Sequence, residues 1–506
     1  GGAPLDSRAV AALLESRGLR QADAASYGHR DLFELADEVF AEARKLAGSV
    51  PVKVKYPKEL RRPLFVRFIF NYLRGLLSSL PLAGQILVFL ALGVSLWAWT
   101  GFSERLATVI TLGALASYLV TGGVIQAMSW RGAAYVGEGQ HHFAREYVGR
   151  MMRVGLILAG GVGVVWFTVN LIIPVFETEA MAIALLYYGL LTLLWLNLSV
   201  LYLLEQRLAA LLIMLGGLGL VLLVFAAYRA SVIPAHTMGL IATVTAMYFR
   251  GRRVMAERES GVPESARLAR LPRDSILIFT AAPYFIYGTL YFIFVFIDRI
   301  NAWSAAKDPL PYLIWFRPPY EAGMDLALIP LILTAPVLEH TLREFSLRMI
   351  PLQELTASAD FSSLNRKFRE FYVRQLTLGA AIGVAALVFA ESVVFGMRLA
   401  GIGLEFVANS TVLFVFHIGA VGYLLLVWGL FNGMVAQAVT QLGPVIRALV
   451  IAFAVNLIVG YVLSRVLSYE YAVLGLLAGA LTFGVLSTRI VLNLLESLDY
   501  YYFATV

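Results

Sequence analysis

Long apolar segments alternate with short polar ones from about residue 78 onward. About twelve of these segments reach the length of roughly 20 residues that a helix needs to cross a ~30 Å hydrocarbon core. The pattern predicts an all-α, polytopic membrane protein. The spans are expected at about residues 78–101, 106–129, 154–176, 180–204, 208–229, 231–249, 276–298, 325–345, 376–397, 405–432, 442–465 and 469–492.

The connections between the spans divide the chain into two similar halves. Long basic connections, Arg131 to Arg153 and Leu342 to Gln375, follow the second span of each half. This favours a parallel six-plus-six repeat about an axis along the membrane normal, with a coincidence of loop lengths as the alternative. The expected divisions are a cytoplasmic helical extension at 1–52, a basic amphipathic interfacial helix at 53–77, a first six-helix bundle at 78–249, a cytoplasmic linker at 250–275, a second six-helix bundle at 276–495 and a cytoplasmic tail at 496–506.

A basic stretch precedes the first span. Between residues 53 and 77, lysines and arginines interleave with aromatic and aliphatic side chains, which is typical of a helix in the headgroup plane of anionic membrane lipids. Simple anchoring is expected there, with capture of a lipid-linked substrate as the alternative. The first fifty residues predict two short amphipathic helices, too small for much of a core, that dock on the membrane domain, on a partner or on each other.

The distribution of charge predicts how the chain is oriented in the membrane. Lys and Arg fall mostly on every second connection, so the positive-inside rule predicts that both termini are cytoplasmic. This bias explains the net charge of +7 without nucleic-acid binding. The absence of cysteine excludes disulfides and thiol chemistry. With no Walker A, GxGxxG or HExxH motif, neither an enzyme nor a cofactor is expected, and energy for transport must come from a gradient, from polymer synthesis or from a partner.

Ionisable and amide side chains inside the spans are the candidate pathway residues, because a charge stranded in lipid is costly. The first six spans carry no Asp, Glu, Lys or Arg away from their ends, and the second half is richer. The candidates are Asp298, Arg299, Trp303, Asp325, Glu339, His340, Glu391, His417, Arg447 and Asn456. Of these, Glu339, Glu391 and His417 are expected as proton or cation sites. The alternatives are that the glutamates pair with arginines or reach an interface, and that His417 makes an interhelical hydrogen bond.

The longest outer connection, residues 299–324, is rich in aromatic and proline residues. Aromatic rings stack on sugar rings, and Asp, Lys and Arg hydrogen-bond hydroxyl groups, so this connection suits the exit of a glycan. Trp and Tyr also populate every membrane interface, and anchoring is the competing interpretation.

Three segments resemble one family. The runs Phe296–Trp303, Tyr320–Phe345 and Leu498–Phe503 are similar to the segment after the seventh span, the following span and the aromatic C-terminal end of the PelG-like exopolysaccharide transporters. The resemblance covers roughly residues 276–506, and Asp298, Arg299 and Trp303 are its matching positions. It implies the MATE/flippase-like superfamily, with two six-helix bundles around a central cavity. It also implies a glycan substrate and, as partners, a cytoplasmic glycosyltransferase and other polysaccharide-synthesis subunits.

Three functions follow from the sequence. The favoured one is transport of an exopolysaccharide or lipid-linked glycan from cytoplasm to periplasm, coupled to a cytoplasmic glycosyltransferase. A gradient-driven small-molecule antiporter of the multidrug-exporter type is the first alternative. The second is a non-transporting membrane scaffold of a synthesis complex, which the uncharged first half favours.

Overall fold

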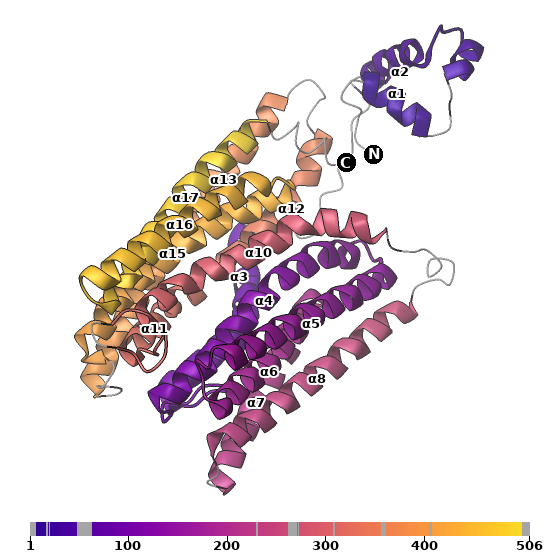
Figure 1. The fold of residues 1–506 in the computed structure, drawn as a ribbon. Helices are drawn as coiled ribbons and strands as arrows, with labels where there is room; N and C mark the ends of the chain where they lie inside the picture. Colours follow the sequence, from indigo (N-terminus) through magenta and orange to yellow (C-terminus); the bar gives the residue numbers. More distant parts are fainter. Residues whose placement is uncertain are drawn as a thin grey trace. The chain divides into compact units, whose positions relative to one another are not determined.

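The structure is a computed structural model that describes residues 7–16, 19, 21–47, 63–228, 231–261, 271, 273–306, 309–355, 361–401, 403 and 407–497. Over these residues the chain is helical apart from turns and one isolated β-bridge (Figure 1). Twelve helical segments are long and apolar enough to cross a membrane, six in each half of the sequence. The all-α, twelve-span fold class is therefore confirmed.

Six long helices make up the first half. They are α3 (Leu64–Leu92), α4 (Glu104–Gly137), α5 (His141–Ile172), α6 (Thr178–Leu203), α7 (Arg207–Tyr228) and α8 (Val232–Ser260). Helix α6 is the most buried, and its Leu191, Leu194, Trp195 and Leu198 lie at the centre of the half's apolar core. Helix α5 exposes most of its apolar side chains, as expected of a helix that faces lipid.

Within the described residues, the second half also has six spans, one of which is interrupted between two helices. Its helices are α10 (Asp274–Trp303), α11 (Pro318–Thr334), α12 (Pro336–Leu355), α13 (Phe361–Ala400), α15 (Ser410–Ala438), α16 (Gly443–Val466), the 3-10 turn η3 (Tyr469–Ala472) and α17 (Val473–Glu496). Helix α11 packs along α15. The break between α11 and α12 lies at Ala335, because Pro336 cannot donate a backbone hydrogen bond into the preceding turn. The hydroxyl of Tyr72 donates to the carbonyl of Leu333 nearby, at 2.7 Å.

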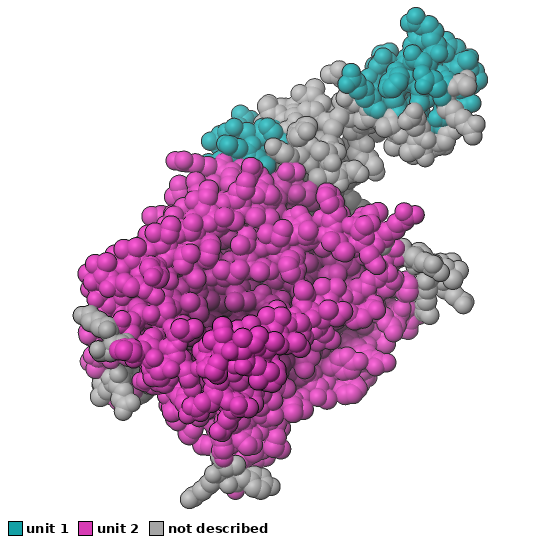
Figure 2. Space-filling view, viewed as in Figure 1, with its two compact units in different colours: residues 1–71, 339–377, 492–506 teal, residues 72–338, 378–491 magenta. Residues whose placement is uncertain are grey.

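The N-terminal residues form a small helical group. Helix α1 (Ser7–Ser16), the 3-10 turn η1 (Gln21–Tyr27) and α2 (Leu32–Ala47) share a minimal core of Val10, Ala11 and Ala36. By contacts, the chain divides into two compact units (Figure 2). The smaller unit holds residues 1–71, 339–377 and 492–506, and the larger holds residues 72–338 and 378–491.

Several helices run past the ends of their apolar segments. The expected loop from Arg131 to Arg153 is wrong, because α4 continues to Gly137 and α5 begins at His141. The expected loop from Leu342 to Gln375 is likewise wrong, because α12 runs to Leu355 and α13 begins at Phe361. Hydropathy marks where the hydrocarbon core ends, whereas a helix continues into the aqueous phase as long as its own backbone bonds are satisfied.

The start of the membrane domain also differs from expectation. The later part of the interfacial helix expected at 53–77 and most of the first span form one helix, α3, which ends at Leu92. Residues 53–62, the middle of the linker (262–270) and the tail from Leu498 lie outside the described residues. In the larger unit, residues 93–103 form a compact turn between α3 and α4.

The two halves meet closely where α4 crosses α10. A Cβ atom on Gly288 would lie 2.6 Å from the carbonyl oxygen of Gly122, and one on Gly123 would lie 2.6 Å from that of Phe285. Only glycine allows the two backbones to approach in this way. Trp130 stacks on Tyr284 further along the same contact, with ring centroids 3.9 Å apart.

Candidate transport cavity and adjoining charged cluster

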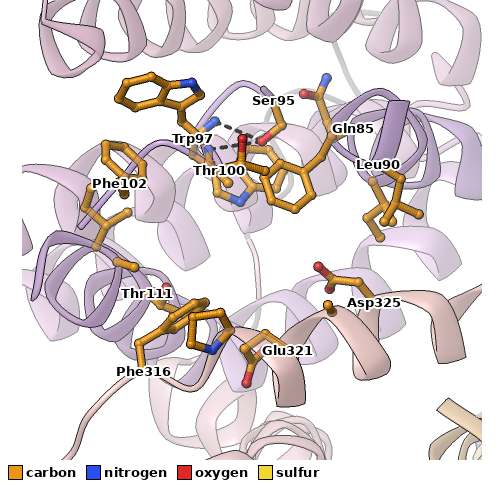
Figure 3. A pocket seen from close by; sticks show the side chains of 18 of the residues that line it. Gln85, Leu90, Ser95, Trp97, Thr100, Phe102, Thr111, Phe316, Glu321 and Asp325 are labelled. Carbon is orange, nitrogen blue, oxygen red and sulfur yellow. Dashed lines mark hydrogen bonds between the residues drawn. The ribbon is translucent and has the colours of Figure 1, made fainter. Parts of the chain in front are cut away.

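A cavity of about 290 Å³ lies between the two halves within the larger unit (Figure 3). The first half contributes the end of α3, the turn at 93–103 and the start of α4. The second half contributes the start of α11, the residues just before it, Met397 of α13 and Val407. Its polar and aromatic lining includes Gln85, Ser95, Trp97, Trp99, Thr100, Phe102, Glu104, Thr111, Phe316, Glu321 and Asp325.

The wall from the first half is aromatic. Trp97, Trp99 and Phe102 all come from the turn between α3 and α4. The turn is fixed by Gln85 of α3, whose side-chain oxygen accepts the backbone N–H of Leu96 at 2.9 Å. It is also fixed by Ser95, whose hydroxyl oxygen accepts the backbone N–H of Ala98 at 3.0 Å (Figure 3). The indoles are therefore held in place as part of the cavity wall.

The opposite wall carries carboxylates. Glu321 and Asp325 lie one helical turn apart on α11 and face the cavity across from Trp97 and Phe102 (Figure 3). Glu104 adds a third carboxylate, and the described lining contains no Lys or Arg. Asp325 has no hydrogen bond or ion pair to another described residue, so its carboxylate is available to a bound molecule.

Glu321 links the cavity to a buried charged cluster. One of its oxygens accepts from Nε of Arg299 at 3.1 Å, and the other accepts from the indole N–H of Trp303 at 2.9 Å. Arg299 also donates to the hydroxyl of Tyr423 at 3.2 Å, which ties α10 to α11 and α15. Its guanidinium lies over the ring of Phe296, 5.5 Å from the centroid. The positive charge of Arg299, which would be costly in the membrane, is thus balanced by Glu321 and stabilised by Tyr423 and Phe296.

Asp298 belongs to the same cluster but does not line the cavity. Its side chain is fully buried, and one oxygen accepts from the hydroxyl of Tyr320 at 2.7 Å. The other oxygen has no hydrogen-bond partner among the described residues. Asp298 and Tyr320 therefore form a second link between α10 and α11.

Residues 309–317, here called the strap, connect the second half to the first beside the cavity. The indole N–H of Trp315 donates to Glu104 at 2.7 Å, and the backbone N–H of Phe316 donates to the hydroxyl of Thr108 at 2.9 Å. Tyr312 packs edge-on against Phe176, with centroids 4.9 Å apart. The strap belongs to the expected outer connection, of which Lys307 and Asp308 lie outside the described residues.

The structure brings together one group of the predicted pathway residues. Asp298, Arg299 and Trp303 form the cluster at the end of α10, and Asp325 lines the adjoining cavity. Sequence reasoning missed Glu321 and Tyr423, which complete the cluster. Glu321 was assigned to the outer connection because the polar run Arg317–Glu321 lowers the local hydropathy, although Pro318 at the first helical position signals a helix start.

The remaining predicted residues lie elsewhere. Glu391 and His417 contact each other at 3.2 Å and are half exposed, so His417 makes an interhelical contact, one of the expected alternatives. Arg447 is exposed near the start of α16, and Asn456 is buried and donates to the carbonyl of Phe294 at 3.0 Å.

His340 and Glu339 belong to the smaller unit. There His340 is buried and lies within hydrogen-bond distance of Asn71, 3.3 Å between the two nitrogens. The ion pair Arg67–Glu344, at 3.2 Å, is buried in the same unit. Glu339 is partly buried, and neither it nor His340 lines the cavity described above.

Comparison with known proteins shows the fold but no close relative. No protein-family model matches the chain, and no curated protein matches it. Among solved structures, an outward-facing multidrug resistance MATE family transporter of the MOP superfamily superposes with a TM-score of 0.56 at 15% identity, covering 88% of this chain and all of that one. The chain has the fold of the MATE transporters. The eukaryotic MATE transporter AtDTX14 gives a TM-score of 0.54 at 13% identity over 87% of this chain and all of that one.

A third MATE transporter, ClbM in complex with Rb+, superposes with a TM-score of 0.52 at 13% identity, covering 88% of this chain and 98% of that one. The fold is the one that the sequence resemblance implied. At these identities the likeness concerns the fold alone.

Proposed function

We propose that this chain is a transporter of the bacterial inner membrane that moves an exopolysaccharide or lipid-linked glycan from the cytoplasm to the periplasm. The observation that carries this proposal is the cavity shared by the two halves, in which indole and phenyl rings of the turn at 93–103 face two carboxylates of α11. The MATE fold supports the transport of a solute in general, and the PelG-like segments support a glycan in particular.

The two walls suit a sugar for complementary reasons. A pyranose ring presents apolar C–H faces, which stack on Trp97 and Trp99, and hydroxyl groups at its edge, which donate to Glu321 and Asp325. Charge-assisted hydrogen bonds of this kind are the stronger ones. At about 290 Å³ the cavity lies near the lower end of small-molecule sites, roughly 300–1,000 Å³, so it holds a short piece of a glycan at a time.

Binding can be tested through the cavity's own indoles. The purified chain should change its tryptophan fluorescence when short neutral oligosaccharides are added, with saturation. A Trp97→Leu/Trp99→Leu variant should lose that response, whereas Trp166→Leu, on α5 and outside the cavity lining, should keep it. A parent chain that shows no saturable response to any oligosaccharide, and whose vesicles accumulate none, would remove the basis for the glycan proposal.

The partner proposal has its own test. We propose that a cytoplasmic glycosyltransferase and other synthesis subunits dock on the cytoplasmic surface, with α1 and α2 as part of that surface. Affinity purification from native membranes should recover a glycosyltransferase with the full chain and less of it with a chain lacking residues 1–47. Equal recovery by both chains would show that the extension has no part in docking.

A gradient-driven antiporter is the second candidate, and Asp325 favours it. A cavity carboxylate without a described ionic partner is suited to a proton or monovalent cation, and the MATE transporter ClbM was determined in complex with Rb+. Purified chain in vesicles should then exchange small organic cations for protons when a pH gradient is imposed. Such exchange without glycan binding would favour the antiporter over the glycan transporter.

A further inference from the structure

A carboxylate and an imidazole on the spans of the second half contact each other and are half exposed. Nε2 of His417 on α15 lies 3.2 Å from Glu391 on α13, and the two side chains are 50% and 49% exposed. At 1.5 Å per residue, Glu391 lies about 14 Å from the C-terminal end of α13, and His417 about 10 Å from the N-terminal end of α15. The pair is therefore well inside the apolar length of both helices.

Exposed apolar side chains surround this pair. On α13, residues Val384, Val388, Phe395 and Leu399 recur with Glu391 at helical spacing, and each is more than half exposed. On α15, Val421 lies one turn beyond His417 and is 40% exposed. These residues together with Glu391 and His417 form the α13–α15 patch, in which one polar pair sits near the middle of an apolar surface.

A surface of this composition is costly when it faces lipid. Hydrocarbon cannot hydrogen-bond the remaining lone pairs of Glu391 or the second ring nitrogen of His417. Ionisable residues inside membranes nearly always face protein or a water-filled cavity, and neither residue lines the cavity between the halves. The patch therefore indicates a surface that another protein segment covers.

We propose that a second copy of this chain covers the α13–α15 patch, so that the transporter is a twofold symmetric dimer. The argument is charge complementarity, because a patch that carries an acceptor beside a donor is complementary to itself. A twofold rotation places His417 of one copy opposite Glu391 of the other, and each pair gains the hydrogen bonds that lipid withholds. The apolar side chains around them then make van der Waals contacts across the interface, as side chains do between packed membrane helices.

The oligomeric state of the full chain in lipid nanodiscs tests the proposal. Native mass spectrometry should find mainly dimers of the parent chain. Val388→Trp, which enlarges a side chain in the patch, should raise the dissociation constant of the dimer by about tenfold or more, equivalent to roughly 1.4 kcal/mol. Val164→Trp on α5 is the matched control, because Val164 is 65% exposed and Val388 is 62% exposed, and it should leave the dimer unchanged.

A second variant separates a protein-covered patch from a lipid-facing one. Glu391→Leu/His417→Leu should weaken the dimer if the polar pair specifies it. If the patch faces lipid, the same substitution should leave a monomer whose thermal unfolding midpoint rises. The absence of cysteine allows a direct check, since Val421→Cys should give a thiol cross-link between two chains, whereas Val462→Cys on α16 should not.

Several outcomes would overturn the proposal. A parent chain that is monomeric at every ratio of protein to lipid excludes the dimer. A dimer that both tryptophan variants weaken equally lies on another face. If the Val421→Cys chain is isolated cross-linked to a different membrane protein and never to a second copy of itself, the patch belongs to that partner.

Discussion

Glu321 is the residue on which the buried cluster and the cavity converge. It faces the cavity, accepts from Arg299 and accepts from the indole of Trp303. Its 13% side-chain exposure and the 7% exposure of Arg299 leave the pair largely without water. The neutralisation of Arg299 therefore depends on this carboxylate.

Glu321→Gln should destabilise the protein strongly. The substitution removes the only described ion pair of Arg299 and leaves its buried guanidinium hydrogen-bonded to neutral groups, and losing one member of a buried ion pair costs about 3–5 kcal/mol. The midpoint of thermal unfolding in detergent should fall accordingly. Glu321→Gln combined with Arg299→Met removes both charges and should recover part of the loss. An unchanged midpoint for the single variant would mean that the ion pair does not form.

Asp325→Asn should separate function from stability. Asp325 lines the cavity with no described ionic partner, so replacing it leaves no buried charge uncompensated. The free energy of unfolding should therefore change by no more than about 0.5 kcal/mol. Transport into vesicles should fall, and Asp325→Glu should retain part of it. Full transport by the Asn variant would show that this carboxylate does not contact the cargo.

At single positions, the sequence indicated which residues matter better than it indicated where they lie. Asp298, Arg299 and Asp325 could be chosen because charges are rare in apolar segments, and the structure places them in or beside the cavity. The same reasoning selects Glu391 and His417, which lie half exposed and outside the cavity lining. The rarity of a charge indicates that it has a role, but hydropathy does not tell which side of a helix faces the pathway.

At the scale of elements, the strap is the contact that the proposed transport would have to change. Trp315 and Phe316 belong to the second half and donate to α4 of the first half beside the cavity. In any alternating-access cycle the halves separate on this side, so both hydrogen bonds must break. The strap therefore predicts a gate.

A reversible cross-link across the strap should stop transport. Since the chain has no cysteine, Glu104→Cys/Trp315→Cys introduces the only two thiols, which a bifunctional thiol reagent can bridge. Transport should be lost on cross-linking and restored by reduction. Arg145→Cys/Glu259→Cys joins α5 to α8 within the first half, replacing an ion pair there, and should leave transport intact. Transport by the cross-linked strap variant would contradict a gating role.

The number and order of the helices followed from hydropathy, and their ends did not. Twelve apolar segments give twelve spans because each must satisfy its backbone hydrogen bonds within the bilayer. The extensions of α4 to Gly137 and of α12 to Leu355 begin at charged residues, Arg131 and Arg343, where a hydropathy window ends the span. Their composition gives no clear helix signal either, because the first contains Gly132 and the second contains Pro351.

At the scale of the whole molecule, the crossing of α4 and α10 holds the halves together. Backbone meets backbone there at Gly122 and Gly288, and the side chains of Gln126 and Gln437 hydrogen-bond at 3.2 Å between the same halves. This crossing lies further along α4 than the residues that line the cavity.

Gly288→Ala should push the halves apart at this point. The added methyl group would lie 2.6 Å from the backbone oxygen of Gly122, so a helix must move, and overpacking of this kind typically costs about 1–3 kcal/mol. The unfolding midpoint in detergent should fall. Gly161→Ala on α5 meets no atom within 4 Å and should stabilise the helix slightly. Equal midpoints for the two variants would show that the crossing tolerates a side chain.

The glycine crossing is the point about which a tilt of one half against the other would turn. Gly122 and Thr108 are fourteen residues apart on α4, which makes a lever arm of about 21 Å at 1.5 Å per residue. If the halves rock about the crossing by about 10°, Thr108 moves by about 4 Å, more than a hydrogen bond of about 3 Å can stretch before it breaks. A modest tilt at a crossing outside the cavity lining would thus release Phe316 and Trp315 in one motion, and a label on the strap would report movement that originates about 21 Å away.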